Sequence, residues 1–392
     1  MKKNRSTTTA TPFWRDTRII PILLQIVFVV LVLFIGSFLF TNAMNGLDKL
    51  GIEFGFNFLP NTAFFDIGEN HIEYGPQDSY FRAYLVGIVN TIRVGIIGII
   101  LASIVGTIVG ISRLSKNWLL NKIATVYVEI FRNTPLLVQI FIWYYAVILP
   151  LPLIEEQFKV GPIFISNRGT ALPWFNATSG STLWIILFFV GLITAVVVRS
   201  RLMKKQIETG NNTRSGLWSL TVFIGTLIIA LIVTRTAPFT FDNPSINGRL
   251  FEGGYILTPE FKAILIALVV YTSTYIAEIV RGGIQAISKG QVEASKALGL
   301  KNSTTMSKVI FPQAIRIIIP PVTSQYLNLI KNSSLAVAVG YPELVYVSGT
   351  VLNQTGRAIE NITLVILVYL TLSVITSIIM NIFNKKFQLV ER

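Results

Sequence analysis

Polar side chains interrupt several apolar segments of this 392-residue chain. An ionisable group in such a segment needs a partner or a water-filled cavity, because burying it in hydrocarbon is costly. Glu278 and Arg281 are three residues apart, so on a helix they share a face and can form an ion pair. Lys331, Asn332 and Ser333 follow one another in a later segment. These side chains either line a polar path through a membrane or hold helices together.

How well a polar path or helix packing explains a side chain differs from residue to residue. For Glu278, an ion pair explains the residue at least as well as contact with a transported solute. Lys331 has the charge to attract a carboxylate. An irregular backbone inside a membrane is tolerated only beside protein or a water-filled path. For the polar residues that begin at Lys331, a transport path and helix packing are therefore equal alternatives. Tyr275 and Gln139 are further candidates for the path, although packing explains each of them too.

The residue patterns of common enzymes are missing from the sequence. It has no cysteine and one histidine, His71, which lies among acidic residues and is best explained as a loop histidine, so we expect no metal site. Ser288, Lys289 and Gly290 have the residue types of a phosphate-binding loop in the wrong arrangement. No H-E-x-x-H, G-x-S-x-G or paired-carboxylate motif is present. We therefore expect no catalytic residue and no cofactor bound by this chain.

A polar and basic stretch from Ser288 to Pro312 separates two apolar segments. Ser288 followed at the third position by Gln291 is a capping-box pattern, which predicts the start of a helix. Gly299 predicts its end, because glycine readily adopts the left-handed conformation that closes a helix. The stretch therefore contains a short helix of roughly ten residues.

This short helix has one small apolar face. Ala294, Ala297 and Leu298 lie at positions i, i+3 and i+4, whereas Glu293 and Lys296 lie off the stripe. A polar helix of this length is not stable by itself in water. We therefore expect the face to dock against another surface.

The composition is that of a polytopic membrane protein. Hydrophobic residues make up 52% of the chain and charged residues only 13%, whereas a soluble domain carries about a quarter charged residues. About eight segments are apolar and near the length that spans a hydrocarbon core. They cover about 19–40, 94–111, 135–150, 182–198, 217–234, 261–280, the part after 312 up to 339 that the pair Pro320 and Pro321 breaks, and 362–383.

Basic residues gather in alternate connections between these segments. The N-terminus, the stretches near 113–132, 199–214 and 281–316, and the C-terminus are rich in Lys or Arg, whereas the other connections are acidic or neutral. The positive-inside rule then places both termini and the Ser288–Pro312 stretch in the cytoplasm. The same rule explains the net charge of +14 without nucleic-acid binding.

Several motifs in the chain resemble those of a transporter family. Glu293-Ala294-Ser295, Gly299 and Pro312 match the spacing of the E-A-A-x3-G-x9-I-x-L-P signature found in membrane subunits of binding-protein-dependent ABC importers, with Ser295, Val309 and Phe311 as departures. Further stretches resemble the polar amino-acid permease family. They are Arg132–Gln139, Tyr275–Ile284, Gly290-Gln291 and Ile330–Leu335. The resemblance covers about 82–150 and 258–385, and the extra segments resemble the longer permeases of general L-amino-acid importers.

The resemblance implies an all-α polytopic fold with a five-helix permease core plus additional helices, in the bacterial inner membrane. It implies that the Ser288–Gly299 helix is a coupling helix that docks on a cytoplasmic ATP-binding subunit, one of a pair, which would bind the ATP and Mg. A second homologous permease and a periplasmic amino-acid-binding protein would complete the importer. The coupling residues are then Ser288, Gln291, Glu293, Ala294, Ala297, Leu298, Gly299 and Pro312.

The expected domain organisation follows from the same comparison. Residues 1–81 would hold a cytoplasmic N-terminus, a first span and a periplasmic loop, and residues 82–385 the permease domain. An inserted region at 151–257 would carry two additional helices, and 386–392 would form a cytoplasmic tail. Two other classes remain: an ion-coupled secondary amino-acid carrier, for which no internal repeat is evident, and a membrane scaffold without transport.

Overall fold

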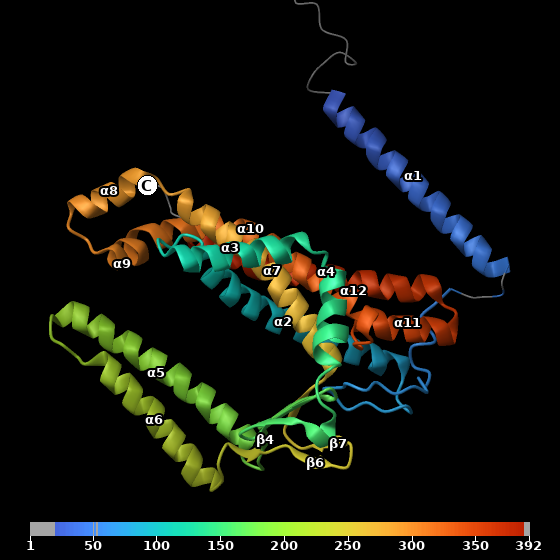
Figure 1. Cartoon of the computed structure of the whole chain (residues 1–392), viewed down its shortest axis with the longest axis horizontal. Helices are drawn as coiled ribbons and strands as arrows, with labels where there is room; N and C mark the ends of the chain where they lie inside the picture. Colours follow the sequence, from blue (N-terminus) through green and yellow to red (C-terminus); the bar gives the residue numbers. More distant parts are fainter. Residues whose placement is uncertain (1–19, 50, 52–53, 388–392) are drawn as a thin grey trace, which may run out of the picture.

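The computed structural model describes residues 20–49, 51 and 54–387, and it is built mainly of helices (Figure 1). The α-helices are α1 (Ile20–Lys49), α2 (Tyr80–Ser112), α3 (Trp118–Asn133), α4 (Leu136–Phe141), α5 (Ser181–Thr209), α6 (Ser215–Thr234), α7 (Pro259–Gln285), α8 (Lys289–Ala297), α9 (Asn302–Thr305), α10 (Phe311–Asn332), α11 (Leu344–Thr355) and α12 (Ala358–Phe387). π-Helical turns η2 (Ile142–Ile148) and η4 (Met306–Ile310) and 3-10 turns η3 (Ile154–Glu156) and η5 (Ser333–Val339) lie between them.

Among the described residues, six helices are long and apolar enough to span a membrane: α1, α2, α5, α6, α7 and α12. The run from α9 to η5 together with α11, bent by 53° at the break, makes a seventh if it is counted as one span. The expected count of about eight is therefore not confirmed. The segment predicted at 135–150 accounts for the difference, because it forms a shorter helix over Leu136–Ile148.

The core is formed by α2, α7 and α10, with α4, η2, α11 and α12 around them. Glycines allow α2 and α7 to approach closely, as the G-x-x-x-G pattern of a packed helix pair predicts. A Cβ atom at Gly106 would lie 2.7 Å from the Ile276 side chain, and one at Gly110 would lie 2.7 Å from the Ala277 carbonyl oxygen. At both positions there is room for the hydrogen atom of a glycine but not for a side chain.

The proline pair does not break its segment, contrary to the sequence prediction. Helix α10 continues through Pro320 and Pro321 to Asn332. Helices α7 and α12 pack against it, and such neighbours allow a spanning helix to tolerate lost backbone bonds. The irregular backbone begins later, where α10 gives way to η5 at Ser333.

Two outer segments form β-structure, which the all-α expectation did not include. The strands are β1 (Phe158–Val160), β2 (Ile163–Ser166), β3 (Gly169–Leu172), β4 (Trp174–Ala177), β5 (Phe239–Asp242), β6 (Ser245–Asn247), β7 (Leu250–Glu252) and β8 (Tyr255–Leu257). They form an antiparallel sheet in the order β1-β2-β3-β8 and the two-stranded pairs β4-β5 and β6-β7. Strand β4 precedes α5 and β5 follows α6, so this β-structure carries the α5–α6 hairpin.

The two ends of the molecule differ in what they contain (Figure 1). Helices α8 and α9, the end of α12 and the α5–α6 turn lie at one end, and α11 lies at the other. Helix α1 stands apart from the remaining helices, and its apolar window buries no surface within the chain. The basic stretches at 199–214 and around α8 therefore lie at the same end of the molecule.

Candidate functional site

Helix α8 begins at the predicted cap, although one detail differs. The Ser288 hydroxyl accepts a hydrogen bond from the Gly290 amide at 3.3 Å. Gln291 instead donates its backbone amide to the Ser288 carbonyl at 3.0 Å. Ser288 therefore satisfies the first turn by itself, and the Gln291 side chain is exposed.

The end of α8 is set by Gly299, as predicted. Its φ angle is +70°, in the left-handed region where a side chain costs energy. The Leu300 amide then donates to the Ser295 carbonyl at 3.0 Å and the Gly299 amide to the Lys296 carbonyl at 2.9 Å. These bonds satisfy carbonyl groups that a helix end otherwise leaves unpaired.

The apolar face of α8 is uncovered in the described chain. Ala294, Ala297 and Leu298 are all exposed, and Leu298 is 78% exposed. Ser295, next to this face, is buried and donates its hydroxyl to the Gln291 carbonyl at 2.7 Å. Ser295 thus replaces the signature alanine without an unpaired polar atom.

Both ends of α8 connect firmly to the core. On one side α7 ends at Gln285, and on the other the chain passes through α9 and η4 into α10. Pro312 lies in the first turn of α10, where its missing amide is tolerated. A Cβ atom at Gly283 of α7 would lie 2.5 Å from Ile318 of α10. The chain on either side of α8 therefore leads to two helices that are in close contact with each other.

Glu278 forms two ion pairs near the α8 end of α7. Arg281 donates from Nη2 to Glu278 Oε2 at 2.8 Å, and Arg113 at the end of α2 contacts Glu278 Oε1. Arg113 and Glu278 are largely buried, at 13% and 20% side-chain exposure. This arrangement is the predicted pair extended to a second arginine, and it ties α2 to α7.

Two other residues predicted for the path have partners close by. The Gln139 side chain is buried, and its amide donates to the Phe131 and Thr134 carbonyls at 2.7 Å and 3.0 Å. It therefore holds the turn that joins α3 to α4. The Tyr275 hydroxyl lies 3.0 Å from that of Tyr271. These contacts explain both residues structurally.

The remaining predicted path residues lie at the end of α10. Lys331 is exposed, Asn332 is half-buried and Ser333 is buried. The Ser333 hydroxyl donates to the Ile330 carbonyl at 2.7 Å, so it caps the end of α10. The three predicted path residues Gln139, Tyr275 and Lys331 lie on different elements, α4, α7 and α10, and their polar groups have different neighbours. Of these residues, Lys331 alone keeps an exposed charge.

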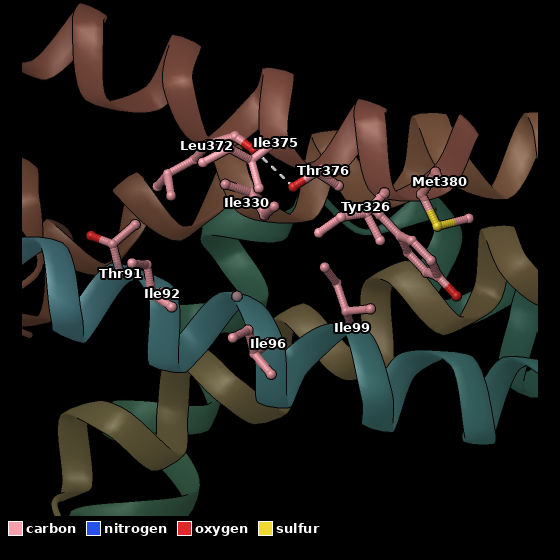
Figure 2. A pocket seen from close by; sticks show the side chains of 12 residues that line it. Thr91, Ile92, Ile96, Ile99, Tyr326, Ile330, Leu372, Ile375, Thr376 and Met380 are labelled. Carbon is pink, nitrogen blue, oxygen red and sulfur yellow. Dashed lines mark hydrogen bonds between the residues drawn. The ribbon is translucent and has the colours of Figure 1, made fainter. Parts of the chain in front are cut away.

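A pocket of about 340 Å³ lies between α2, α10 and α12, and no pattern in the sequence predicted it (Figure 2). Its walls are almost entirely apolar. The polar groups that reach it are already bonded: Thr91 donates to the Gly87 carbonyl at 2.9 Å, and Tyr326 pairs with Ser103 at 2.7 Å. A charged solute would find no partner there.

A buried polar network between the first half of α2 and the loop before it was not predicted from the sequence. Arg93 of α2 pairs with Glu69 of the loop before α2. Thr258 donates to the other Glu69 oxygen, and His71 lies 3.3 Å from the carboxylate. Arg93 also lies 3.7 Å above the Phe261 ring.

The ionised form of Glu69 is favoured by these partners. Burial by itself would raise the pKa of this carboxyl. The hydrogen bonds from His71 and Thr258 and the charge of Arg93 outweigh burial, so its pKa lies below the ordinary value. The network therefore fixes the loop to α2 and α7. Among the described residues, no three acidic or histidine side chains gather as a metal site would require.

Comparison with known proteins shows which family this chain resembles. The profile of the binding-protein-dependent transport system inner membrane component family matches residues 95–389. The general L-amino acid transport system permease protein AapQ of Rhizobium johnstonii is 44% identical, covering 93% of this chain and 91% of its own. The glutamate/glutamine/aspartate/asparagine transport system permease protein BztB of Rhodobacter capsulatus is 41% identical and covers 96% of each chain.

Among solved structures, the crystal structure of an amino acid ABC transporter with histidines aligns with a TM-score of 0.47 at 19% identity, covering 78% of this chain and 95% of that one. The family match spans most of the chain and includes α7, the α8 stretch and α10. The chain therefore belongs to the family of binding-protein-dependent transport system inner membrane components.

Proposed function

We propose that this chain is the permease subunit of an ATP-driven amino-acid importer, in which α8 docks on a cytoplasmic ATP-binding subunit. The uncovered face of α8 carries the proposal, because a nine-residue helix with an exposed Leu298 needs a partner surface. Family membership makes that partner the ATPase of a binding-protein-dependent importer. ATP and Mg would then be bound by the ATPase pair and not by this chain.

The contacts around α8 suggest how energy would reach the membrane. ATP-driven closure of the ATPase pair would displace α8, and the chain connects α8 to α7 on one side and, through α9 and η4, to α10 on the other. The close contact of Gly283 with Ile318 would make α7 and α10 move as one body, and the ion pair of Glu278 with Arg113 would carry α2 along with α7. Rigid-body rotation of this kind is a known route for switching access between two sides.

The remaining partners follow from the family. A second homologous permease would supply the other half of the pathway, and a periplasmic binding protein would deliver the amino acid to the outer end, where β1–β8 lie. Both termini would be cytoplasmic, on the side of α8; residues 1–19 and 388–392 lie outside the described residues. The expected domain limits at 81, 151, 257 and 385 remain predictions.

The substrate class is proposed from the relatives. Permeases named for general L-amino acids and for glutamate, glutamine, aspartate and asparagine cover nearly the whole chain. Lys331 is the path residue with an exposed charge, and a carboxylate is its natural partner. Lys331→Met should therefore lower uptake while leaving assembly with the ATPase intact. Unchanged uptake would assign Lys331 to structure.

Transport by reconstituted vesicles tests the proposal. The chain is purified with the ATPase, second permease and binding protein proposed for its importer, and uptake of labelled glutamate and leucine is followed with and without ATP. We expect uptake only with ATP and its loss in Glu293→Lys or Gly299→Asp. Uptake that needs no ATPase and collapses with a protonophore would instead establish the ion-coupled carrier.

A further inference from the structure

The α5–α6 hairpin ends in a strongly basic turn. Five basic side chains and one acidic side chain, Glu208, lie between residues 199 and 218. The basic residues are Arg199, Arg201, Lys204, Lys205 and Arg214, and all are exposed. We call residues 199–218 the basic hairpin end.

Helix α5 is longer than a membrane span requires. Its 29 residues extend about 43 Å at 1.5 Å per residue, whereas the hydrocarbon core is about 30 Å thick. Helix α6 has 20 residues, which matches that thickness. Thr213, just before α6, donates to the Leu202 carbonyl at 3.0 Å. The part of α5 after Leu202 therefore projects past the start of α6, into the headgroup region.

Two of the basic side chains are directed away from α6. Leu202 and Gln206 lie on the α6 side, where Thr213 contacts both. At 100° per residue, Lys204 falls opposite these two residues and Arg201 about 120° from their midpoint, whereas Lys205 lies on the flank of the helix, about 80° from that midpoint. Within the described residues, the one ion pair among the five cations joins Lys204 to Glu208 at 4.0 Å. The other four exposed cations have no acidic partner among the described residues and can bind an external group.

The surroundings of the hairpin identify the partner. Only 11% of the apolar window of α5 and 6% of that of α6 is buried inside the chain, so lipid surrounds both helices. Trp218, 59% exposed, lies in the first turn of α6, the position of an interfacial aromatic anchor. The positive-inside rule requires cations on one side, but it does not require a helix that continues two turns into the headgroups.

We propose that the basic hairpin end is a binding site for anionic phospholipid headgroups. Arg and Lys donate charge-assisted hydrogen bonds to phosphate, and each such cation strengthens attraction to an anionic surface about fivefold. The site anchors the hairpin, which few contacts hold to the core. The feature that the site recognises is the negative charge of the headgroup.

Energy transfer to labelled lipids tests this site. Because the chain has no cysteine, Asn211→Cys in the turn accepts a single donor dye. The full chain is placed in phosphatidylcholine nanodiscs with a minor fraction of phosphatidylglycerol. An acceptor is attached to an acyl chain of either lipid, so both headgroups stay intact. We expect phosphatidylglycerol to be enriched near the dye by about fivefold or more, and the enrichment to fall as salt is added.

Matched charge removal completes the test. R201Q/K204Q/K205Q should reduce the enrichment to within about twofold, whereas K385Q/K386Q, at the exposed end of α12, should leave it unchanged. Equal transfer to both lipids in the unaltered chain would overturn the proposal without any charge variant. So would enrichment that survives R201Q/K204Q/K205Q, or that K385Q/K386Q abolishes equally.

Discussion

Leu298→Ala should weaken binding of the ATPase without destabilising the permease. The side chain is 78% exposed at the end of α8, so the isolated chain gains little from it. Docking would bury it. The change removes three carbon atoms at about 0.8 kcal/mol each. Multiplied by the exposed fraction, the loss of binding free energy is about 2 kcal/mol, which makes the dissociation constant roughly 30-fold larger.

Binding of the purified ATPase to the permease in nanodiscs, measured by interferometry, gives this constant directly. Ile207→Ala is the matched control, because Ile207 is 80% exposed on the basic hairpin end and has no role in docking. Thermal unfolding of both variants should match the unaltered chain. A change of less than about threefold for Leu298→Ala, or an equal loss for Ile207→Ala, would refute the assignment of α8 as the docking helix.

Glu278→Gln should lower the free energy of unfolding by roughly 1–3 kcal/mol, because it leaves two partly buried arginines without a counter-charge; non-additive thermal shifts with Arg113→Gln would confirm the pairing, and simple additivity would argue against it. Gly106→Ala should destabilise the α2–α7 contact by about 1–3 kcal/mol, whereas Gly95→Ala, whose Cβ would lie 3.5 Å from Ile330, should be tolerated; equal melting temperatures would contradict the packing. Because the pKa of Glu69 is lowered in the folded chain, its stabilisation is present above the ordinary carboxyl value of about 4.3 and is lost as pH falls through the folded pKa. The stability difference between the unaltered chain and Glu69→Gln should therefore shrink in acid, and a difference independent of pH would count against an ionised Glu69.

Features fixed by local residues were predictable from the sequence. Ser288 marks the start of α8 through its capping hydroxyl and Gly299 marks its end through a left-handed backbone, and both limits agree with the structure. Glu278 and Arg281 pair because their spacing on one helix demands it. The sequence could also assign most of the apolar segments as spans, since the required length is a property of the membrane, although the segment at 135–150 forms a shorter helix.

Features that join distant residues were not predictable in this way. Arg93 is 24 residues from Glu69 and Thr258 is 189 residues from it, so no spacing rule brings them together. Pro320 and Pro321 remain within α10 because helices distant in sequence support it. The apolar pocket is likewise enclosed by three separate helices. In each case, tertiary packing decided what local propensity left open.

Contact between α8 and the ATPase is the central claim, and cross-linking measures it directly. A cysteine in place of the exposed Ala297 would be the only one in the chain. We expect a short bifunctional reagent to join it to the ATPase in membranes that hold the whole importer, while Asn211→Cys on the basic hairpin end gives no such product. An ATPase cross-link from Asn211→Cys and none from Ala297→Cys would contradict the account.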